Sequence, residues 1–258
     1  MKLRSMQWVA IIIIIQSTCF PIFGLASGEC VIQTPFCDLP YDSRIYLPES
    51  LLHDVIPLEF LNPQTSVFVD KPIEVIKGIK AKYPHIDPKG EIEPRALELA
   101  LSYFEKLKPE LKRTDFLGLI NYNLHSHEPR FYLLDMNSGI IVEKLLVAHG
   151  EGSDPKNSGV PSLFSNITDS HMSSIGAFIT AETYRSNNVG YALRLDGIEP
   201  SNSKMRSRGV VIHGSEYVQP DLNPIGMSWG CPAIHQNLSK KIIDQVKGGV
   251  LFYSWYNQ

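Results

Sequence analysis

The clearest periodic segment of the chain begins at Pro94. Proline is common in the first turn of a helix, and Leu97, Leu101 and Phe104 follow at the three- and four-residue spacing of one helix face. Pro109 is incompatible with a continuing helix because it lacks an N–H group and clashes with the preceding turn. The pattern therefore predicts one amphipathic helix that ends before Pro109.

Beyond this helix the chain changes to short apolar runs, which are separated by turns containing glycine and asparagine. Asn137-Ser138-Gly139 is typical of the turn of a β-hairpin. Helical spacing returns over residues 240–246, before Gly248-Gly249. The predicted fold is therefore mainly β with a few helices. The runs that predict strands are residues 116–122, 130–135, 140–149, 175–184, 191–195, 209–213 and 250–255.

Residues 27–92 differ from the rest because they are rich in proline and show no long regular period. This composition predicts an irregular N-terminal extension, with a short helical turn around residues 73–83. We expect three parts in the chain: a leader over residues 1–26, the extension over 27–92, and a β-rich catalytic domain over 93–258.

The leader has the features of a secretory signal peptide. Lys2 and Arg4 precede a strongly apolar run over residues 8–15, and Gly24-Leu25-Ala26 supplies small residues at the positions that signal peptidases require. The run is shorter than the roughly 20 residues that cross a bilayer as a helix. An uncleaved membrane anchor is the alternative interpretation.

We therefore expect an exported protein that begins near Ser27 and works in the periplasm or cell envelope. Cys19 is not expected to be lipidated, because the aliphatic residue that usually precedes a lipidated cysteine is absent. No stable membrane insertion is expected after cleavage.

Composition limits the class of protein further. The 258 residues are 43% hydrophobic and 20% charged, enough apolar material for one large folded domain. The net charge is −3, and loss of Lys2 and Arg4 with the leader would make it −5. This charge disfavours nucleic acid as a partner.

Four cysteines are present, and their spacing separates them into groups. Cys19 leaves with the leader, whereas Cys30 and Cys37 are close enough to form a local disulfide in an oxidising compartment. Cys231 is then left without a partner. An odd cysteine in an exported protein is buried and inert, paired with another chain, or kept reduced for chemistry.

The surroundings of Cys231 favour chemistry. An aliphatic run over residues 210–212 ends at His213-Gly214, and Cys231 follows 18 residues after this histidine. A thiol with an ordinary pKa near 8.5 is mostly protonated at neutral pH, so a nucleophilic cysteine needs a neighbouring base. Gly230 permits a tight turn in which the amides of Trp229, Gly230 and Cys231 can face a developing oxyanion.

These residues resemble the L,D-transpeptidase catalytic domain, specifically the murein-transpeptidase (YkuD-like) branch with the cysteine motif S-x-G-C-P-A. The resemblance extends from about residue 116 to the C-terminus. In the commoner branch an aliphatic residue and an arginine follow the cysteine, whereas Pro232-Ala233 stands here, so the role of that arginine is unassigned. The matching segments are Arg130-Phe131-Tyr132, Val147-Ala148-His149-Gly150, Ser174-Ile175-Gly176, residues 191–197, residues 208–214 and Ser228-Trp229-Gly230-Cys231-Pro232-Ala233.

The resemblance implies a mainly β fold and peptidoglycan stem peptides as substrates. It implies Cys231 as the nucleophile, His213 as the general base and the Gly214 carbonyl as the group that orients the imidazole. The thiolate would form a thioester with the third stem residue, and an amine of a second stem peptide would resolve it.

Other side chains near the motifs are candidates for substrate binding, namely Ser228, His149 and Arg208. A structural role in a turn is the alternative for each of them. No cofactor is expected. His125, His127 and Glu128 lack two further ligands at suitable spacing, so no metal site is expected either.

Three alternatives to transpeptidation remain at this point. Water in place of the acceptor amine would give an L,D-carboxypeptidase. A cysteine peptidase acting on ordinary proteins also uses a Cys–His pair. A non-catalytic wall-binding module could hold the stem peptide, but binding alone requires neither Cys231 nor His213.

Overall fold

The computed structural model describes residues 22–26, 29–33, 46–47 and 69–257, with side chains from residue 69 onward. The chain divides into two compact units, residues 1–60 and 61–258. In the first unit three strands, β1 to β3, form an antiparallel sheet in the order β1-β2-β3. Their bounds are Ile22–Ala26 for β1, Glu29–Gln33 for β2 and Tyr46–Leu47 for β3.

β1 falls within the predicted leader, whose residues 1–21 lie outside the described residues. Signal cleavage therefore stays a prediction. The Cys30–Cys37 disulfide also stays a prediction, because only the backbone of Cys30 is described and Cys37 lies outside the described residues.

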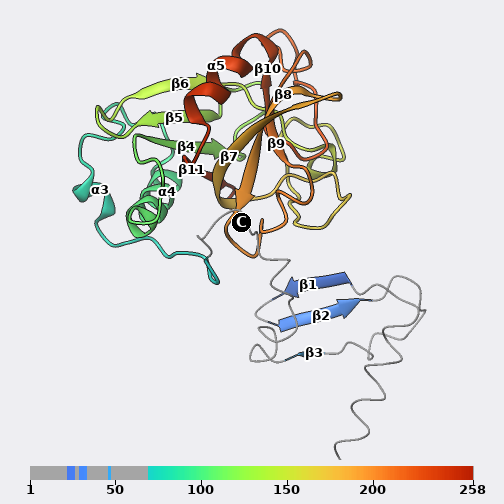
Figure 1. The fold of residues 1–258 in the computed structure, drawn as a ribbon, viewed down its shortest axis with the longest axis horizontal. Helices are drawn as coiled ribbons and strands as arrows, with labels where there is room; N and C mark the ends of the chain where they lie inside the picture. The colour runs from blue at the N-terminus through green and yellow to red at the C-terminus, as the bar shows by residue number, and fades with distance from the viewer. Residues whose placement is uncertain (1–21, 27–28, 34–45, 48–68, 258) are drawn as a thin grey trace, which may run out of the picture. The chain divides into compact units, whose positions relative to one another are not determined.

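The second unit is built on one eight-stranded sheet, which confirms the predicted mainly β fold (Figure 1). Its strand order is β10-β9-β8-β7-β11-β4-β5-β6. The strands are β4 (Phe116–Asn121), β5 (Phe131–Asp135), β6 (Ile141–Leu145), β7 (Gly176–Ser186), β8 (Gly190–Gly197), β9 (Val211–Ser215), β10 (Ala233–His235) and β11 (Leu251–Trp255).

β11, the last strand in the chain, occupies an interior position of the sheet. It pairs in parallel with β4, where Leu251 lies opposite Leu117, and antiparallel with β7, where Leu251 lies opposite Ile179. The half of the sheet that contains β4 to β6 is thus joined to the half that contains β7 to β10 through this strand.

Alternate residues of the interior strands point to opposite faces of the sheet, and both faces are buried. Leu117 and Leu119 of β4 belong to the hydrophobic cluster beneath helix α4 (Pro94–Leu107), whereas Ile120 belongs to the cluster beneath helix α5 (Gln236–Val246). The sheet is therefore covered on each face by a helix.

Gly118 shows how closely the α5 face is packed. A Cβ atom at this position would lie 2.0 Å from the Phe252 ring, so the ring occupies the space that any side chain here would need. Phe252 in turn stacks on Phe178, with ring centroids 5.5 Å apart. Glycine in β4 is thus required by close packing.

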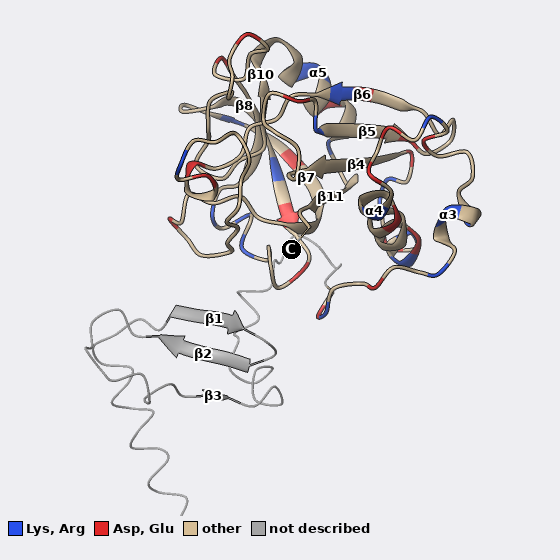
Figure 2. Cartoon of the chain, turned by 180° about the vertical axis from the view of Figure 1, so that it is seen from behind, with Lys and Arg blue, Asp and Glu red and all other residues tan. Residues whose placement is uncertain are grey.

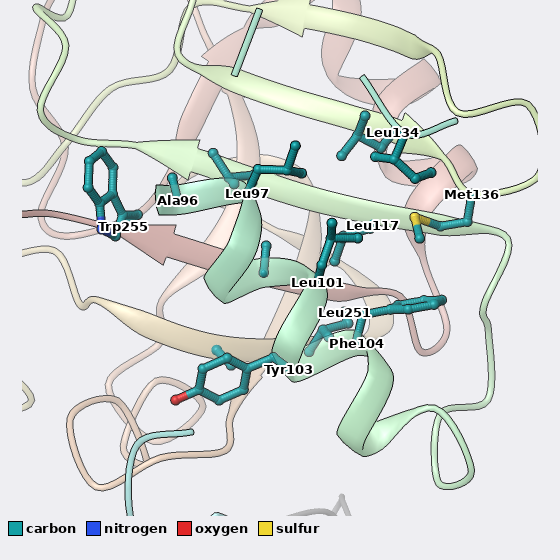
Figure 3. Packing of buried hydrophobic residues seen from close by; sticks show 14 of the residues in the cluster. Ala96, Leu97, Leu101, Tyr103, Phe104, Leu117, Leu134, Met136, Leu251 and Trp255 are labelled. Atoms are coloured by element: carbon teal, nitrogen blue, oxygen red, sulfur yellow. The ribbon is translucent and has the colours of Figure 1, made fainter. Parts of the chain in front are cut away.

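Helix α4 has the bounds that its sequence period predicts. The Glu93 carboxylate accepts a hydrogen bond from the Ala96 amide at 2.6 Å and so caps the N-terminus. Leu97, Leu101 and Phe104 lie against the sheet (Figure 3).

Helix α5 begins four residues earlier than its sequence period predicts. The His235 Nδ1 atom accepts a hydrogen bond from the Asn237 amide at 3.1 Å, so the last residue of β10 caps the helix that follows at once. β10 itself was not predicted.

Residues 69–92, the described end of the extension, pack into the same core as α4. Ile79, Tyr83 and Ile86 are buried there, and a short helix, α3 (Ile79–Lys82), lies within the predicted helical turn. The domain boundary placed before residue 93 stays a prediction.

Charged residues are found on the solvent-facing sides of the covering helices. Figure 2 shows acidic and basic residues on α4 and basic residues on α5. Across the described part of the chain, no helix has the length and apolar character to cross a membrane.

The packing of α4 gives a direct test of the core. Leu101→Ala should lower the free energy of unfolding by about 2–5 kcal/mol, because the fully buried side chain leaves a cavity against the sheet. Lys106→Ala, on the exposed side of the same helix, should change it by less than about 0.5 kcal/mol. Urea unfolding checks both, and equal losses would contradict the assignment of the buried face.

Candidate active site

Pairing between two short strands places the predicted base beside the segment that follows the predicted nucleophile. β9 and β10 are parallel, and Ala233 lies opposite His213. Cys231 is two residues before Ala233, in the turn that leads into β10, and the Val211 amide of β9 hydrogen-bonds its thiol. The Cys231 Sγ atom lies 3.7 Å from the carbonyl oxygen of Gly209, two residues before β9.

His213 is buried and held in one tautomer. Its Nδ1 atom lies 2.9 Å from the Gly214 carbonyl oxygen, which can only accept a hydrogen bond. Nδ1 therefore carries the proton, and Nε2 has a free lone pair. Burial lowers the pKa of His213, which keeps the imidazole neutral near pH 7 and able to accept a proton.

The turn that contains Cys231 depends on Ser228 and Gly230. The Ser228 hydroxyl donates to the Cys231 carbonyl at 2.7 Å and accepts from the Gly230 amide at 3.1 Å. Gly230 has φ 111°, and a Cβ atom there would lie 2.7 Å from the Met172 carbonyl. Only glycine fits this position.

The predicted oxyanion donors are not equivalent in this turn. The Gly230 amide is already used by Ser228, whereas the described residues provide no hydrogen-bond acceptor for the amides of Trp229 and Cys231. The Trp229 side chain is 72% exposed and stacks on His171, with ring centroids 4.8 Å apart. This indole forms an aromatic surface two residues from the thiol.

The environment of the thiol combines burial with positive charge. Burial raises the pKa of Cys231, and the Val211 amide together with the Arg208 guanidinium partly opposes this rise. A thiol with a raised pKa is protonated at neutral pH, so reaction requires a base such as the neutral His213 imidazole.

His149 is 1% exposed and lies at the centre of a buried polar group. The Arg130 Nη2 atom donates to His149 Nδ1 at 2.7 Å, so the ring proton is on Nε2, which faces Asp154 Oδ2 at 3.5 Å. Burial lowers the pKa of His149 to about 4, and the nearby Arg130 charge adds to this effect. His149 is thus neutral and enclosed.

This buried group is connected to the cysteine turn through the backbone. The His149 carbonyl accepts a hydrogen bond from the Ser228 amide at 2.9 Å, and the Ser228 carbonyl accepts one from Glu151 at 2.8 Å. A Cβ atom on Gly150 would lie 2.8 Å from the Gly230 backbone. The segment 149–151 therefore packs against the turn that contains Cys231 and holds it in place.

Arg208 lies beside the same turn, and its guanidinium donates to groups of the loop over residues 165–174. The substrate-binding roles of Ser228, His149 and Arg208 stay predictions, as do the catalytic roles of Cys231, His213 and Gly214.

Several groups near the thiol were not selected from the sequence. Arg130 is fully buried and supports His149. Its motif, Arg130-Phe131-Tyr132, is recognisable in the sequence but does not indicate this role. Tyr122 and Tyr217 both have raised pKa values, mainly through burial, and the Cys231 charge adds to the rise in each. Neither tyrosine stands in a recognisable local pattern.

Comparison with known families decides the identity of this domain. A family model described as the L,D-transpeptidase catalytic domain matches residues 88–255. The chain belongs to this family. A search of the curated proteins finds no match.

Two solved L,D-transpeptidases are similar to this chain. One from Mycobacterium smegmatis is 14% identical, with a TM-score of 0.37 over 55% of this chain and 59% of that one. Another from Stackebrandtia nassauensis is 13% identical, with a TM-score of 0.36 over 78% of this chain and 88% of that one. The chain spans about three fifths of the first structure.

The enclosed state of His149 predicts acid sensitivity. The pKa of His149 is about 4 in the folded protein and about 6.5 in the unfolded chain. As the pH falls from about 6.5 to 4, the unfolded chain therefore binds a proton that the folded protein does not, and the stability decreases. The loss should reach about 3 kcal/mol for this group. In His149→Gln the loss between pH 7 and pH 5 should be smaller, as measured by urea unfolding. An unchanged loss would contradict the assignment.

Proposed function

We propose that this protein is a peptidoglycan L,D-transpeptidase of the S-x-G-C-P-A branch. One observation supports this most directly: the Gly214 carbonyl fixes the proton of His213 on Nδ1, leaving Nε2 free to take a proton, on the strand that pairs alongside the Cys231 turn. Family membership supplies the substrate class, peptidoglycan stem peptides.

The proposed reaction begins with proton transfer from the Cys231 thiol to His213 Nε2. The thiolate attacks the carbonyl carbon of the third stem residue, and the bond to the terminal D-alanine breaks while His213 returns the proton to the departing amine. A thioester remains on Cys231. An amine of a second stem peptide then attacks it, gives up a proton to His213 and restores the thiol.

The negative oxygen that forms at each attack needs donors already in place. Among the described residues the Trp229 and Cys231 amides have no other acceptor, and we assign them as the donors to this oxygen. The Gly230 amide would first have to leave the Ser228 hydroxyl, which instead maintains the turn.

For the remaining predicted residues, the contacts favour supporting roles. His149 is enclosed and connected to the turn only through its carbonyl, so we assign it to positioning Ser228. We also propose an exported location, outside the cytoplasmic membrane, which a peptidoglycan substrate and the predicted leader both support.

Muropeptide turnover tests the function. The mature protein incubated with stem-tetrapeptide muropeptides should release D-alanine and form cross-linked dimers, which mass spectrometry distinguishes from free tripeptides. Dimers support transpeptidation, whereas tripeptides alone would assign a carboxypeptidase. Cys231→Ala should abolish both products, and turnover that persists in this variant would refute the cysteine mechanism.

Covalent trapping tests the nucleophile separately from turnover. A carbapenem presents a strained carbonyl beside a carboxylate, so it should acylate Cys231 and add one inhibitor mass to the wild-type protein. In His213→Ala the adduct should form at least about tenfold more slowly, because general-base assistance is lost. In Cys231→Ser it should largely disappear, and an adduct that persists there would place the nucleophile elsewhere.

A further inference from the structure

Two arginines in the turn before β9 differ in how their charges are compensated. Arg206 binds two carboxylates, those of Glu182 and Asp196. All four hydrogen-bond acceptors of Arg208 are neutral: the carbonyls of Ser165 and Met172 and the hydroxyls of Ser170 and Ser174. Among the described residues, no carboxylate lies within ion-pairing distance of Arg208.

The Arg208 side chain is nevertheless largely withdrawn from water. Its Nε atom is buried and has no hydrogen-bond partner among the described residues. A half-buried guanidinium with no carboxylate in an ion pair is unfavourable. The position therefore favours an anion that forms nearby during function.

The cysteine turn lies directly beside this charge. A Cβ atom on Gly230 would be 3.6 Å from Arg208 Nη2, and the Cys231 Sγ atom contacts the carbonyl of Gly209, the next residue after Arg208. The Val211 amide also donates toward the sulfur. The segment 208–211 thus places an N–H group at the sulfur and a cation beside Gly230, the residue before Cys231.

The same guanidinium also closes the loop over residues 165–174. The two ends of this loop are joined by a hydrogen bond of 3.0 Å from the Ser174 hydroxyl to the Ser165 carbonyl. Arg208 Nη1 donates to both of these oxygens. Nη2 binds the Met172 carbonyl, which packs against Gly230. Arg208 therefore fixes the loop against the cysteine turn.

We propose that Arg208 supplies the fixed positive charge that stabilises the Cys231 thiolate, with its position set by the 165–174 loop. This assignment rests on the proposed function only in taking Cys231 as the nucleophile. The thiolate forms when the S–H bond breaks and the proton passes to His213. Arg208 remains protonated throughout and neither gives nor takes a proton.

Other groups around the sulfur do not supply this charge. His213, further along β9, is neutral, and Tyr122 and Tyr217 have raised pKa values that keep their hydroxyls protonated. Asp169, in the loop, acts electrostatically on Arg208.

The rate of Cys231 alkylation by iodoacetamide, measured from pH 5 to 10, tests the charge without requiring turnover of peptidoglycan. The full chain is used, and mass spectrometry of the Cys231 peptide separates this thiol from the other cysteines. In Arg208→Gln the midpoint should rise by about one pH unit or more. Alkylation at pH 7 should slow roughly threefold to tenfold, since a more basic thiolate is also more nucleophilic.

Two further variants separate charge from support of the loop. Arg208→Lys keeps the charge but loses most of the loop hydrogen bonds, so its midpoint should stay near the wild-type value. Arg206→Gln, the matched control two residues away, should also leave the midpoint in place. Circular dichroism verifies that each variant is folded.

An unchanged midpoint in folded Arg208→Gln would overturn the proposal, as would an equal rise in Arg206→Gln. If Arg208→Gln does not fold, Arg208→Met takes its place: a raised midpoint supports the charge, and an unchanged midpoint overturns the proposal. Loss of muropeptide turnover with normal alkylation in the wild type would instead count against the proposed function alone.

Discussion

The hydrogen bond between Arg130 and His149 is the constraint on which the arrangement around the thiol depends. A fully buried guanidinium donates to the Val147 carbonyl, the Leu124 carbonyl and the His149 ring, and it lies over the Tyr122 ring at 5.3 Å. Because an arginine cannot accept hydrogen bonds, this contact also fixes the tautomer of the histidine. The segment that supports the cysteine turn is thereby anchored in the core.

The catalytic groups we propose are held mainly by backbone contacts, and side chains act through them. The Gly214 carbonyl orients His213, the Ser228 hydroxyl shapes the turn, and the Met172 carbonyl requires glycine at position 230. Such contacts depend little on side-chain rotamers, so the turn keeps its geometry before substrate arrives. This is the preorganisation that stabilisation of an oxyanion needs.

Local patterns explain which features were predictable from sequence. Helix α4 was predicted with correct bounds because Pro94 and its apolar period are local signals, and His213 and Cys231 were selected because each follows a distinctive short motif. β10 was missed because its three residues become a strand only by pairing with β9, which is distant in sequence. The neighbours of Arg208 were missed for a similar reason, since the 165–174 loop has no period and its partners are visible only in space.

The interior position of β11 has a consequence for how the domain forms. The strands on either side of it, β4 and β7, have no sheet partner in common until residues 251–255 are inserted between them. Most of the chain must therefore be synthesised before the two halves of the sheet can join. Closure of the sheet therefore waits for the last strand, and the two halves of the core cannot be sealed against each other before it is in place.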